Sequence, residues 1–366
     1  MTKPHTSEQA TVQLAHGSGG SMMQKLIREV FVESFADVQL EDAASLDLAG
    51  SGSNPADTQL SISTDSYVVQ PLFFPGGDIG RLAVCGTIND VATSGARPLS
   101  LSASFILEEG FSLSDLKRIV SSMADTAKEA GVPIVTGDTK VVGKGQADGI
   151  YITTTGVGQL PAGHTPLLSK DITAGDLILL SGSLGDHGMC IMSQREELSF
   201  AADLSTDAAP LNHMMREVLE AAPHTRIFRD PTRGGLASTL NELAEAAQVR
   251  MTVEERSVPV KTVVRGACEM LGYDVFQVAN EGKIVCIVPA EQAEAALAAM
   301  KASPYGAEAA IIGSVEASEG SDSAEEPGSQ PSAYSAAGFA KVQLRNAFGA
   351  RRVMDTLVGE QLPRIC

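Results

Sequence analysis

The chain carries two successive sets of strand-like and helix-like segments, separated by a Pro-Ala-Gly sequence at residues 161–163. Alternation of this kind is typical of sheets covered by helices. A chain of 366 residues is long enough for two domains of about 100–200 residues each. We therefore predict an α/β (α+β) fold with an N-terminal domain at residues 1–165, a C-terminal domain at residues 166–345, and mixed strand pairing.

The spacing of apolar residues predicts the elements that surround the candidate chemistry. Predicted helices cover residues 21–36, 79–95 and 113–130, and predicted strands cover 58–64, 67–72 and 132–136. The polar pair Asp65-Ser66 falls between two of these strands, where a break would expose the carboxylate. Small residues in the helix over 79–95 favour close packing against a sheet or a partner helix.

Two segments near the C-terminus lack the periodicity of packed elements. Residues 316–337 are mostly Glu, Ser, Gly and Pro, a composition typical of a flexible insertion. Residues 346–366 are predicted to form a flexible tail that ends in Cys366. That cysteine is not placed for prenylation, because the prenylated residue is fourth from the end. It is either a reactive thiol on a mobile tether or an incidental terminal residue.

The charge and cysteine content exclude several classes of protein. With 27 Lys and Arg against 45 Asp and Glu, the net charge is −18, so a nucleic-acid binder is not expected. No stretch reaches the roughly 18 apolar residues that a membrane span requires, and the N-terminal residues predict no secretory signal. Five scattered cysteines indicate no disulfide framework. We expect a cytoplasmic protein.

A glycine-rich segment, His16-Gly17-Ser18-Gly19-Gly20, directly precedes the first predicted helix. Glycines allow backbone N–H groups to approach a phosphate, and the start of a helix adds a favourable dipole. The segment matches neither of the common glycine-rich nucleotide motifs. A flexible loop that begins the helix explains it equally well.

Three aspartates stand beside Ser, Thr or Asn in the N-terminal half, and we expect them at the ends of elements. They are Asp65, Asp90 and Asp138. Each alone is explained by a turn or a helix cap, but together they favour a magnesium–nucleotide site, since Mg²⁺ prefers oxygen ligands. Lys140 lies two residues beyond Asp138 and would share its face of an extended segment.

Two loops in the second half offer further polar groups. Residues 229–235 (Arg-Asp-Pro-Thr-Arg-Gly-Gly) bring Arg229 and Arg233 to the start of a helix, for binding an anion or for a local salt bridge. Glu281 lies beside a glycine before a strand, where it is a candidate general base or simply part of a polar turn. His187 lacks a partner at ligand spacing and is read as a hydrogen-bonded loop histidine.

In combination these segments resemble the HypE family of hydrogenase maturation proteins. These are carbamoyl dehydratases in the ATP-binding superfamily of aminoimidazole ribonucleotide synthetase and selenophosphate synthetase. The motifs span nearly the whole chain: HGSGG (16–20), STDSYVVQPLFFPGGDIG (63–80), NDVATSGA (89–96), FILEEG (105–110), VTGDTKVV (135–142), RDPTRGG (229–235), NEGK (280–283) and PRIC (363–366). The terminal PRIC is the most specific, because only this branch uses its own C-terminal cysteine as substrate.

The resemblance implies a homodimer of N-terminal domains, ATP sites near the interface and catalysis by Cys366, Lys140 and Glu281. It implies Mg²⁺ ligation by Asp65, Asp90 and Asp138, and ATP binding by these aspartates with His16, Gly17, Gly19, Gly20, Thr139 and Arg233. The helix over 79–95 would serve the dimer.

The implied reaction is the ATP-dependent dehydration of a carbamoyl group on Cys366 to a thiocyanate. The carbamoyltransferase HypF would supply the carbamoyl group, and the HypC–HypD complex would receive cyanide for the iron of [NiFe]-hydrogenase. Two alternatives remain. One is a small-molecule kinase or ligase of the same superfamily, and the other is a non-catalytic scaffold that binds nucleotide and docks partners through its tail.

Overall fold

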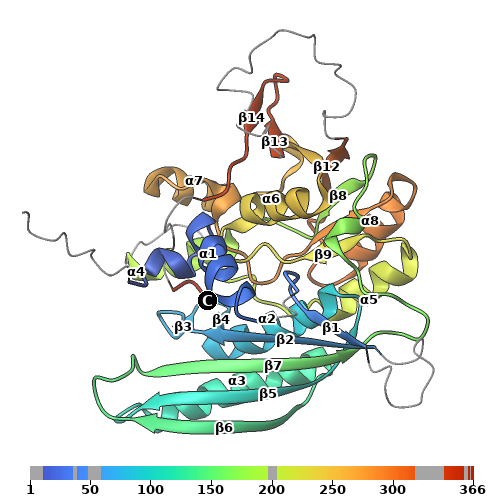
Figure 1. The fold of residues 1–366 in the computed structure, drawn as a ribbon. Helices are drawn as coiled ribbons and strands as arrows, with labels where there is room; N and C mark the ends of the chain where they lie inside the picture. Colours follow the sequence, from blue (N-terminus) through green and yellow to red (C-terminus); the bar gives the residue numbers. More distant parts are fainter. Residues whose placement is uncertain are drawn as a thin grey trace, which may run out of the picture.

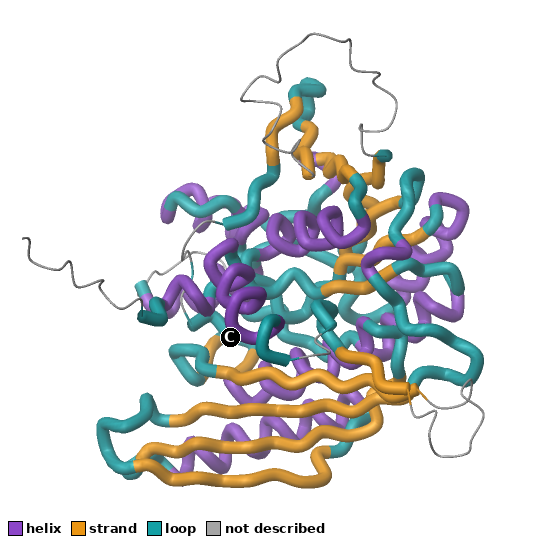
Figure 2. Tube along the Cα trace, viewed as in Figure 1, coloured by secondary structure: helices purple, strands orange, loops and turns teal. Residues whose placement is uncertain are grey.

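The chain folds around two β-sheets, one from each half of the sequence (Figures 1 and 2). The computed structural model describes residues 11–35, 39–47, 59–196, 204–317, 342–357, 362 and 364–366. The predicted insertion at 316–337 therefore lies outside the described residues from residue 318 onward.

The first sheet has five strands in the order β1-β2-β7-β5-β6, and only β5 and β6 pair in parallel. Its strands are β1 (Ala44–Asp47), β2 (Gln59–Tyr67), β5 (Arg97–Glu108), β6 (Ile134–Val142) and β7 (Ile150–Gln159). The helices α2 (Ile79–Thr93) and α3 (Leu113–Ala130) cover one face, and a two-stranded sheet of β3 (Phe73–Phe74) and β4 (Gly77–Asp78) precedes α2. The predicted mixed pairing is confirmed.

The second sheet has seven strands in the order β14-β13-β10-β12-β8-β11-β9. Its strands are β8 (Leu177–Leu180), β9 (Ile227–Arg229), β10 (Arg250–Glu254), β11 (Val285–Val288), β12 (Ala310–Glu316), β13 (Val342–Arg345) and β14 (Arg351–Val353). Helices of this half are α4 (Asp186–Arg195), α5 (Asn212–Ala221), α6 (Gly235–Ala247), α7 (Thr262–Leu271) and α8 (Ala293–Ala302). Part of the predicted tail thus belongs to this sheet, because β14 pairs with β13.

Short helices complete the structure. An N-terminal helix consists of α1 (Ser21–Leu26) and a π-helical continuation (Ile27–Val32), so the helix predicted over 21–36 ends earlier than expected. Single 3-10 turns occupy Leu14–Gly17, Ser169–Asp171, Glu255–Ser257, Val275–Gln277 and Ala290–Gln292. In Figure 1, α1 lies beside α6 and close to the C-terminus. The N-terminal helix and the end of the chain therefore lie close together at the junction of the two halves.

Local sequence signals place the helices of the first half accurately. The hydroxyl of Ser112 accepts a hydrogen bond from the backbone N–H of Asp115 and caps α3, which ends at Gly131 with φ of 69°. Every residue of α2 except Arg81 is buried. A Cβ on Gly86 would lie 2.3 Å from the hydroxyl of Tyr67 on β2, so the glycine lets the helix approach the sheet. The small residues of α2 thus serve the sheet, and the expected role of this helix in a dimer is wrong because no face of it is free.

Two predicted strand ends are also wrong, and the reason is the same in both cases. Strand β2 runs through Asp65 without a break, and the segment expected as a strand over 67–72 leaves the sheet after Tyr67. Strand β6 continues to Val142, so Asp138 lies in mid-strand. Hydrogen bonds to neighbouring strands keep these polar residues in the sheet, and that pairing is not visible in the local pattern. Asp90 is likewise inside α2 and not at its end.

Candidate functional site

A pocket of about 500 Å³ lies where the two halves of the chain meet, within the usual range for ligand sites. Its lining comes from the N-terminal helix, residues 39–42, β2, α2, α6 and the loops before α6 and β11. The side chain of Gln24 on α1 donates a hydrogen bond of 2.8 Å to Glu242 on α6. This bond ties the N-terminal helix to the wall of the pocket.

Three buried or half-buried carboxylates converge in this pocket. One oxygen from each of Asp42, Asp90 and Asp230 lies within 4.8 Å of the others. The hydroxyl of Ser63 donates to Asp90 at 2.9 Å, and one oxygen of Asp42 is buried without a hydrogen-bond partner. We call these three residues the carboxylate cluster. Only Asp90 among them was predicted as a metal ligand.

The electrostatics of the carboxylate cluster favour a bound cation. Burial, together with the charges of Asp65 and the other cluster members, raises the pKa of Asp90 well above its ordinary value. Burial and the same kind of repulsion raise the pKa of Asp230 and bring the pKa of Asp42 to about 6. Close carboxylates cannot all remain charged in a low-dielectric site. A divalent cation removes that conflict, and the oxygen-only donor set fits Mg²⁺.

The predicted ligand Asp65 lies beside the carboxylate cluster. Residues 61, 63, 65 and 67 point to the helix-covered face of β2, since their neighbours Thr64 and Ser66 bond across the outer face to Thr155 and Thr153. One oxygen of Asp65 accepts a hydrogen bond of 3.3 Å from Tyr67. Asp65 therefore lines the pocket from the sheet side.

An arginine neutralises part of the negative charge. The guanidinium of Arg229 pairs with Glu41 at 2.6 Å and with Asp42 at 2.8 Å. Burial would lower the pKa of Arg229, but the charge of Asp42 raises it overall. Two roles were predicted for Arg229, anion binding and a local salt bridge, and the structure shows the salt bridge. This pairing holds in place the segment that carries Asp42.

Only part of the predicted glycine-rich segment reaches the pocket. Gly19 lines it with φ of 80°, and a Cβ there would lie 2.5 Å from the Cβ of Arg233. This close approach requires glycine. His16, Gly17 and Gly20 do not line the pocket. The Nδ1 atom of His16 accepts a hydrogen bond from the backbone of its own turn, and a Cβ on Gly17 would meet no heavy atom within 4 Å.

The loop before α6 supplies a positive charge. Arg233 lines the pocket, and its pKa is raised by the charge of Cys366. Helix α6 begins after Gly234, whose φ is 78°, and no side chain caps it. The backbone N–H of Gly235, the first residue of this helix, donates to the carbonyl of Thr232 at 3.0 Å, so this N–H group is not available to an anion.

Glu281 and Cys366 line the same pocket. Glu281 is 4% exposed, one of its carboxylate oxygens has no hydrogen-bond partner, and its backbone N–H donates to Asp207 at 3.0 Å. Burial and nearby carboxylates raise its pKa well above the ordinary value. Burial also raises the pKa of the Cys366 thiol to about 12, although Arg233 opposes the shift. A carboxylate that readily takes a proton thus lies in one site with the terminal sulfur.

Lys140, Asp138 and Thr139 are not in this pocket, contrary to the prediction. The register from β2 through β7 and β5 to β6 places Asp138 in the row of Ser66, on the outer face. Three strand spacings of about 4.8 Å separate β6 from β2. The ammonium group of Lys140 pairs with Asp138 at 2.6 Å, and both side chains are more than half exposed. The two residues share a face as predicted, but it is the face away from the carboxylate cluster.

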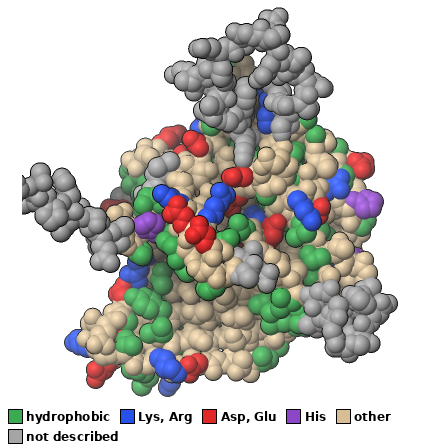
Figure 3. Space-filling view, in the orientation of Figure 1, with side chains coloured by type: hydrophobic (Ala, Val, Ile, Leu, Met, Phe, Trp, Pro, Cys, Tyr) green, Lys and Arg blue, Asp and Glu red, His purple; other side chains and the backbone are tan. Residues whose placement is uncertain are grey.

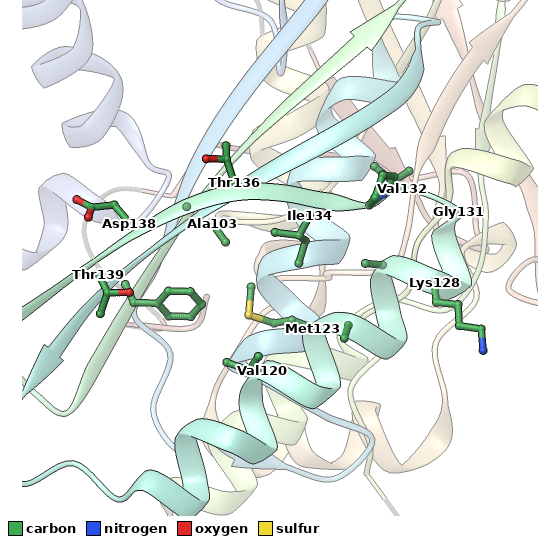
Figure 4. A pocket seen from close by; sticks show the side chains of 15 residues that line it. Ala103, Val120, Met123, Lys128, Gly131, Val132, Ile134, Thr136, Asp138 and Thr139 are labelled. Atoms are coloured by element: carbon green, nitrogen blue, oxygen red, sulfur yellow. The ribbon is translucent and has the colours of Figure 1, made fainter.

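The inner side of β6 forms an apolar groove with α3 (Figure 4). Ile134 and Met123 face into this groove of about 870 Å³, whereas Asp138 and Thr136 point away from it. The outer face of the sheet is turned toward the viewer in Figure 3, where no described segment covers it. It includes the exposed side chain of Ile106, which pairs in register with Lys140.

Asp42 and Asp230 were not assigned as ligands from the sequence. Asp42 stands next to Glu41 in a segment with no helical or strand periodicity, and Asp230 lies between Arg229 and a proline, where a salt bridge is an adequate explanation. The only sequence signal for a ligand was the acidic side chain itself, which for Asp230 lies directly before a proline. The long-range contact that gathers the carboxylates was not visible.

The comparisons with known proteins agree with this arrangement. Residues 40–160 match the AIR synthase related protein N-terminal domain, and residues 173–324 match the corresponding C-terminal domain. The chain is 51% identical over 359 residues to the carbamoyl dehydratase HypE of Azotobacter vinelandii, covering 97% of both chains.

Two solved structures are similar along almost the whole chain. A HypE–HypF complex contains a chain that is 44% identical with a TM-score of 0.79, covering 91% of this chain and 99% of that one. The hydrogenase maturation protein HypE in complex with ATP is 46% identical with a TM-score of 0.77, covering 97% of this chain and 100% of that one.

Among the residues that the structure describes, no helix is long and apolar enough to cross a membrane. Sequence identity over nearly the full length, both domain matches and the fold lead to one conclusion. The chain belongs to the HypE family, the hydrogenase maturation enzymes named carbamoyl dehydratases.

Proposed function

We propose that this chain is an ATP-dependent carbamoyl dehydratase that acts on its own C-terminal cysteine. The product is a thiocyanate on Cys366, which supplies a cyanide ligand to the iron of [NiFe]-hydrogenase. One observation carries the proposal: the sulfur of Cys366 lies in the same pocket as Glu281, Arg233 and the carboxylate cluster. A substrate group, a base and a cation site therefore share one space.

The reaction is the loss of one water from the carbamoyl group. The carbamoyl oxygen takes the terminal phosphoryl group of ATP while ADP leaves, and one N–H proton is released. The second N–H proton is removed as the C–O bond breaks and phosphate departs, which leaves a C≡N group on the sulfur. Glu281 is the base for this second proton, because its buried carboxyl group lines the same pocket as Cys366 and one of its oxygens has no hydrogen-bond partner.

The remaining charged groups bind and orient. Asp42, Asp90 and Asp230 hold Mg²⁺, with Asp65 next to them. Bound there, Mg²⁺ offsets the negative charge of the phosphates. Arg233 directs its guanidinium toward the tail and the anion, and Gly19 allows the N-terminal segment to lie directly on it.

We further propose that the enzyme is a homodimer in which the open face of the five-stranded sheet contacts a second copy. The uncovered apolar side chain of Ile106 on this face and its charged pair Asp138–Lys140 support the proposal. In the dimer, Asp138 and Lys140 of one chain would reach the phosphates in the pocket of the other, whereas Thr139 lies in the inner row of β6 and lines the apolar groove. Symmetric pairing of one face with itself is the usual arrangement of a dimer.

The partners follow from the chemistry of the tail. HypF, found with a HypE in the similar complex, would load the carbamoyl group onto Cys366. A HypC–HypD complex would accept the cyanide, and the exchange would take place in the cytoplasm. The alternative of a small-molecule kinase is less favoured, because the chain's own terminus occupies the pocket. A scaffold that binds nucleotide without turnover gives no reason for Glu281 to be buried there.

Intact-protein mass spectrometry of carbamoylated protein tests the proposal. With ATP and Mg²⁺, the carbamoylated chain should lose the mass of one water. Glu281→Gln should still bind ATP but keep its carbamoyl group, and Cys366→Ala should not become carbamoylated at the terminus. ATP binding without any water-loss product would support the scaffold instead. Unchanged turnover by Glu281→Gln would remove this residue from the role of base.

A further inference from the structure

The last three residues of the chain are held by bonds to their main chain and by the side chain of Arg364, which donates to the carbonyl of Val68 at 3.0 Å and pairs with Asp148. The backbone N–H of Val68 donates to the Cys366 oxygen at 3.0 Å. The Nε2 atom of His187 lies 2.8 Å from the carbonyl oxygen of Ile365, and the guanidinium of Arg195 donates to the carbonyl of residue 364. His187 and Arg195 both come from α4, and we call them the tail clamp. The carbonyl groups of residues 364 and 365 and the terminal carboxylate of Cys366 therefore each have a donor from outside the tail.

The hydrogen bonds of His187 define its protonation. A carbonyl can only accept, so Nε2 carries the proton that bonds to Ile365. Nδ1 then accepts from the hydroxyl of Thr206 at 2.8 Å, while that hydroxyl oxygen accepts from the N–H of Ala208. His187 is completely buried, and this burial lowers its pKa. The ring is neutral and both nitrogens are used, which leaves it no capacity to bind a metal.

The tail packs closely against helix α4 beside the tail clamp. A Cβ on Gly188 would lie 2.4 Å from a methyl group of Val278 and 3.2 Å from one of Leu362. The side chains of Leu362 and Ile365 are buried. Arg195 also donates from Nε to the carbonyl of Gln70 at 2.6 Å, so it joins the tail to the segment that follows β2. The buried apolar side chains of Leu362 and Ile365 anchor the tail, and the hydrogen bonds to its main chain set where its last residue lies.

We propose that His187 and Arg195 are positioning residues for the reaction at Cys366, because they bind the main chain of residues 364 and 365 and so fix where the terminal sulfur enters the pocket. This proposal rests on the proposed function. Because the clamp bonds to carbonyl groups and not to the sulfur, it holds the tail equally well whether the cysteine is free or carries a carbamoyl group. Neither residue touches the reacting atoms.

The reactivity of the terminal thiol provides a test that needs neither ATP nor a carbamoyl group. In the docked tail, the raised pKa of Cys366 keeps the sulfur protonated, and only the thiolate reacts with iodoacetamide. The alkylation rate therefore reports how much of the tail is released. The other four cysteines are buried, and peptide mapping identifies the labelled site.

Full-length His187→Leu should alkylate at Cys366 about ten times faster than the wild type, since a lost buried hydrogen bond weakens docking by about this factor. His187→Gln, whose amide can donate to the same carbonyl, should restore most of the slow rate. His213→Leu, on the exposed surface, is the matched control and should alkylate like the wild type. If His187→Leu loses its folded structure, Arg195→Met, at a half-buried position, provides the same comparison.

The outcomes separate this proposal from the function on which it rests. Faster alkylation together with a slower water loss from the carbamoylated protein supports the tail clamp. An unchanged alkylation rate in folded His187→Leu and Arg195→Met overturns it. Faster alkylation with an unchanged rate of water loss also overturns it, because the clamp would then hold the tail without positioning the sulfur. If the wild type itself loses no water, the proposed function fails, whatever the alkylation rates are.

Discussion

The two acidic regions of this chain look alike in sequence and differ completely in structure. The carboxylate cluster of Asp42, Asp90 and Asp230 lies in a pocket between the two halves, where burial and neighbouring carboxylates raise the pKa values of its members. Asp138 lies on an open sheet face, where Lys140 pairs with it and lowers its pKa. A buried group of like charges is relieved by protonation or by a bound cation, whereas the exposed pair of Asp138 and Lys140 is already neutral.

The difference has a geometric cause. Asp65, beside the cluster, points to the helix-covered face of the five-stranded sheet, while Asp138 points to the other face. A strand cannot turn one side chain through the sheet without shifting the whole register. One chain therefore cannot bring both regions to the same phosphate, and a second copy is required if both serve one site.

The largest effect is expected on turnover, when a residue of the carboxylate cluster is replaced. Asp90→Asn should reduce turnover about a thousandfold, because one ligand of the cation is lost. The same change should raise the free energy of unfolding of the metal-free protein by about 1 kcal/mol, since repulsion in the cluster falls. Activity assays and thermal melts measure the two effects. Asp138→Asn should leave stability unchanged, and a destabilised but active Asp90→Asn would contradict the assignment of the cluster.

The stabilisation of the protein by Mg²⁺ is the second largest effect expected to distinguish the carboxylate cluster from the exposed pair. At a concentration about 100 times its dissociation constant, Mg²⁺ should stabilise the wild type by about 2.7 kcal/mol. Asp230→Asn should lose most of this gain, and Asp138→Asn should keep it. The measurement is the unfolding midpoint with and without Mg²⁺. An equal loss in both variants would mean that Asp138 also helps to hold the ion, which would contradict a cation site made by the carboxylate cluster alone.

The glycines of the N-terminal segment offer a matched pair. Gly19→Ala places a Cβ against Arg233 at a φ of 80°, which should cost roughly 1–3 kcal/mol of stability and weaken ATP binding. Gly17→Ala meets no atom within 4 Å and should change neither quantity. Chemical denaturation and ATP titration compare the two. Equal effects would indicate that the whole segment, and not Gly19 alone, lies on the pocket.

The smallest effect concerns pH. Burial lowers the pKa of His187, against opposition from Asp207 and with help from Arg195. Below pH 6.5 this histidine is protonated in the unfolded chain and stays neutral in the folded one. The free energy of unfolding therefore falls as the pH drops through this range, by at most about 1.4 kcal/mol per pH unit. His187→Gln should lose this component in denaturation curves between pH 7 and pH 5. Parallel curves for both proteins would show that the pKa of His187 is the same in the folded and unfolded chain, which would contradict this prediction.

Much of the fold could be predicted because its signals are local. Helix α3 has its serine cap, its apolar stripe and its terminal glycine in one stretch of sequence, and the structure matches the prediction. Family motifs singled out Glu281, Arg233 and Cys366, and all three line one pocket; their chemical roles stay predictions. Asp42 and the strand positions of Asp65 and Asp138 could not, because they depend on which distant strands pair.

The most direct test of the account asks whether Lys140 acts in the pocket of a second chain. One chain carries Lys140→Ala and keeps Cys366; the other keeps Lys140 and carries Asp90→Asn with Cys366→Ala. Mass spectrometry with ATP and Mg²⁺ follows the carbamoylated tail of the first chain. It should keep its carbamoyl group alone and lose one water after the two chains are mixed and allowed to exchange. Water loss by the first chain alone, or none after exchange into mixed dimers, would contradict a site built from two chains.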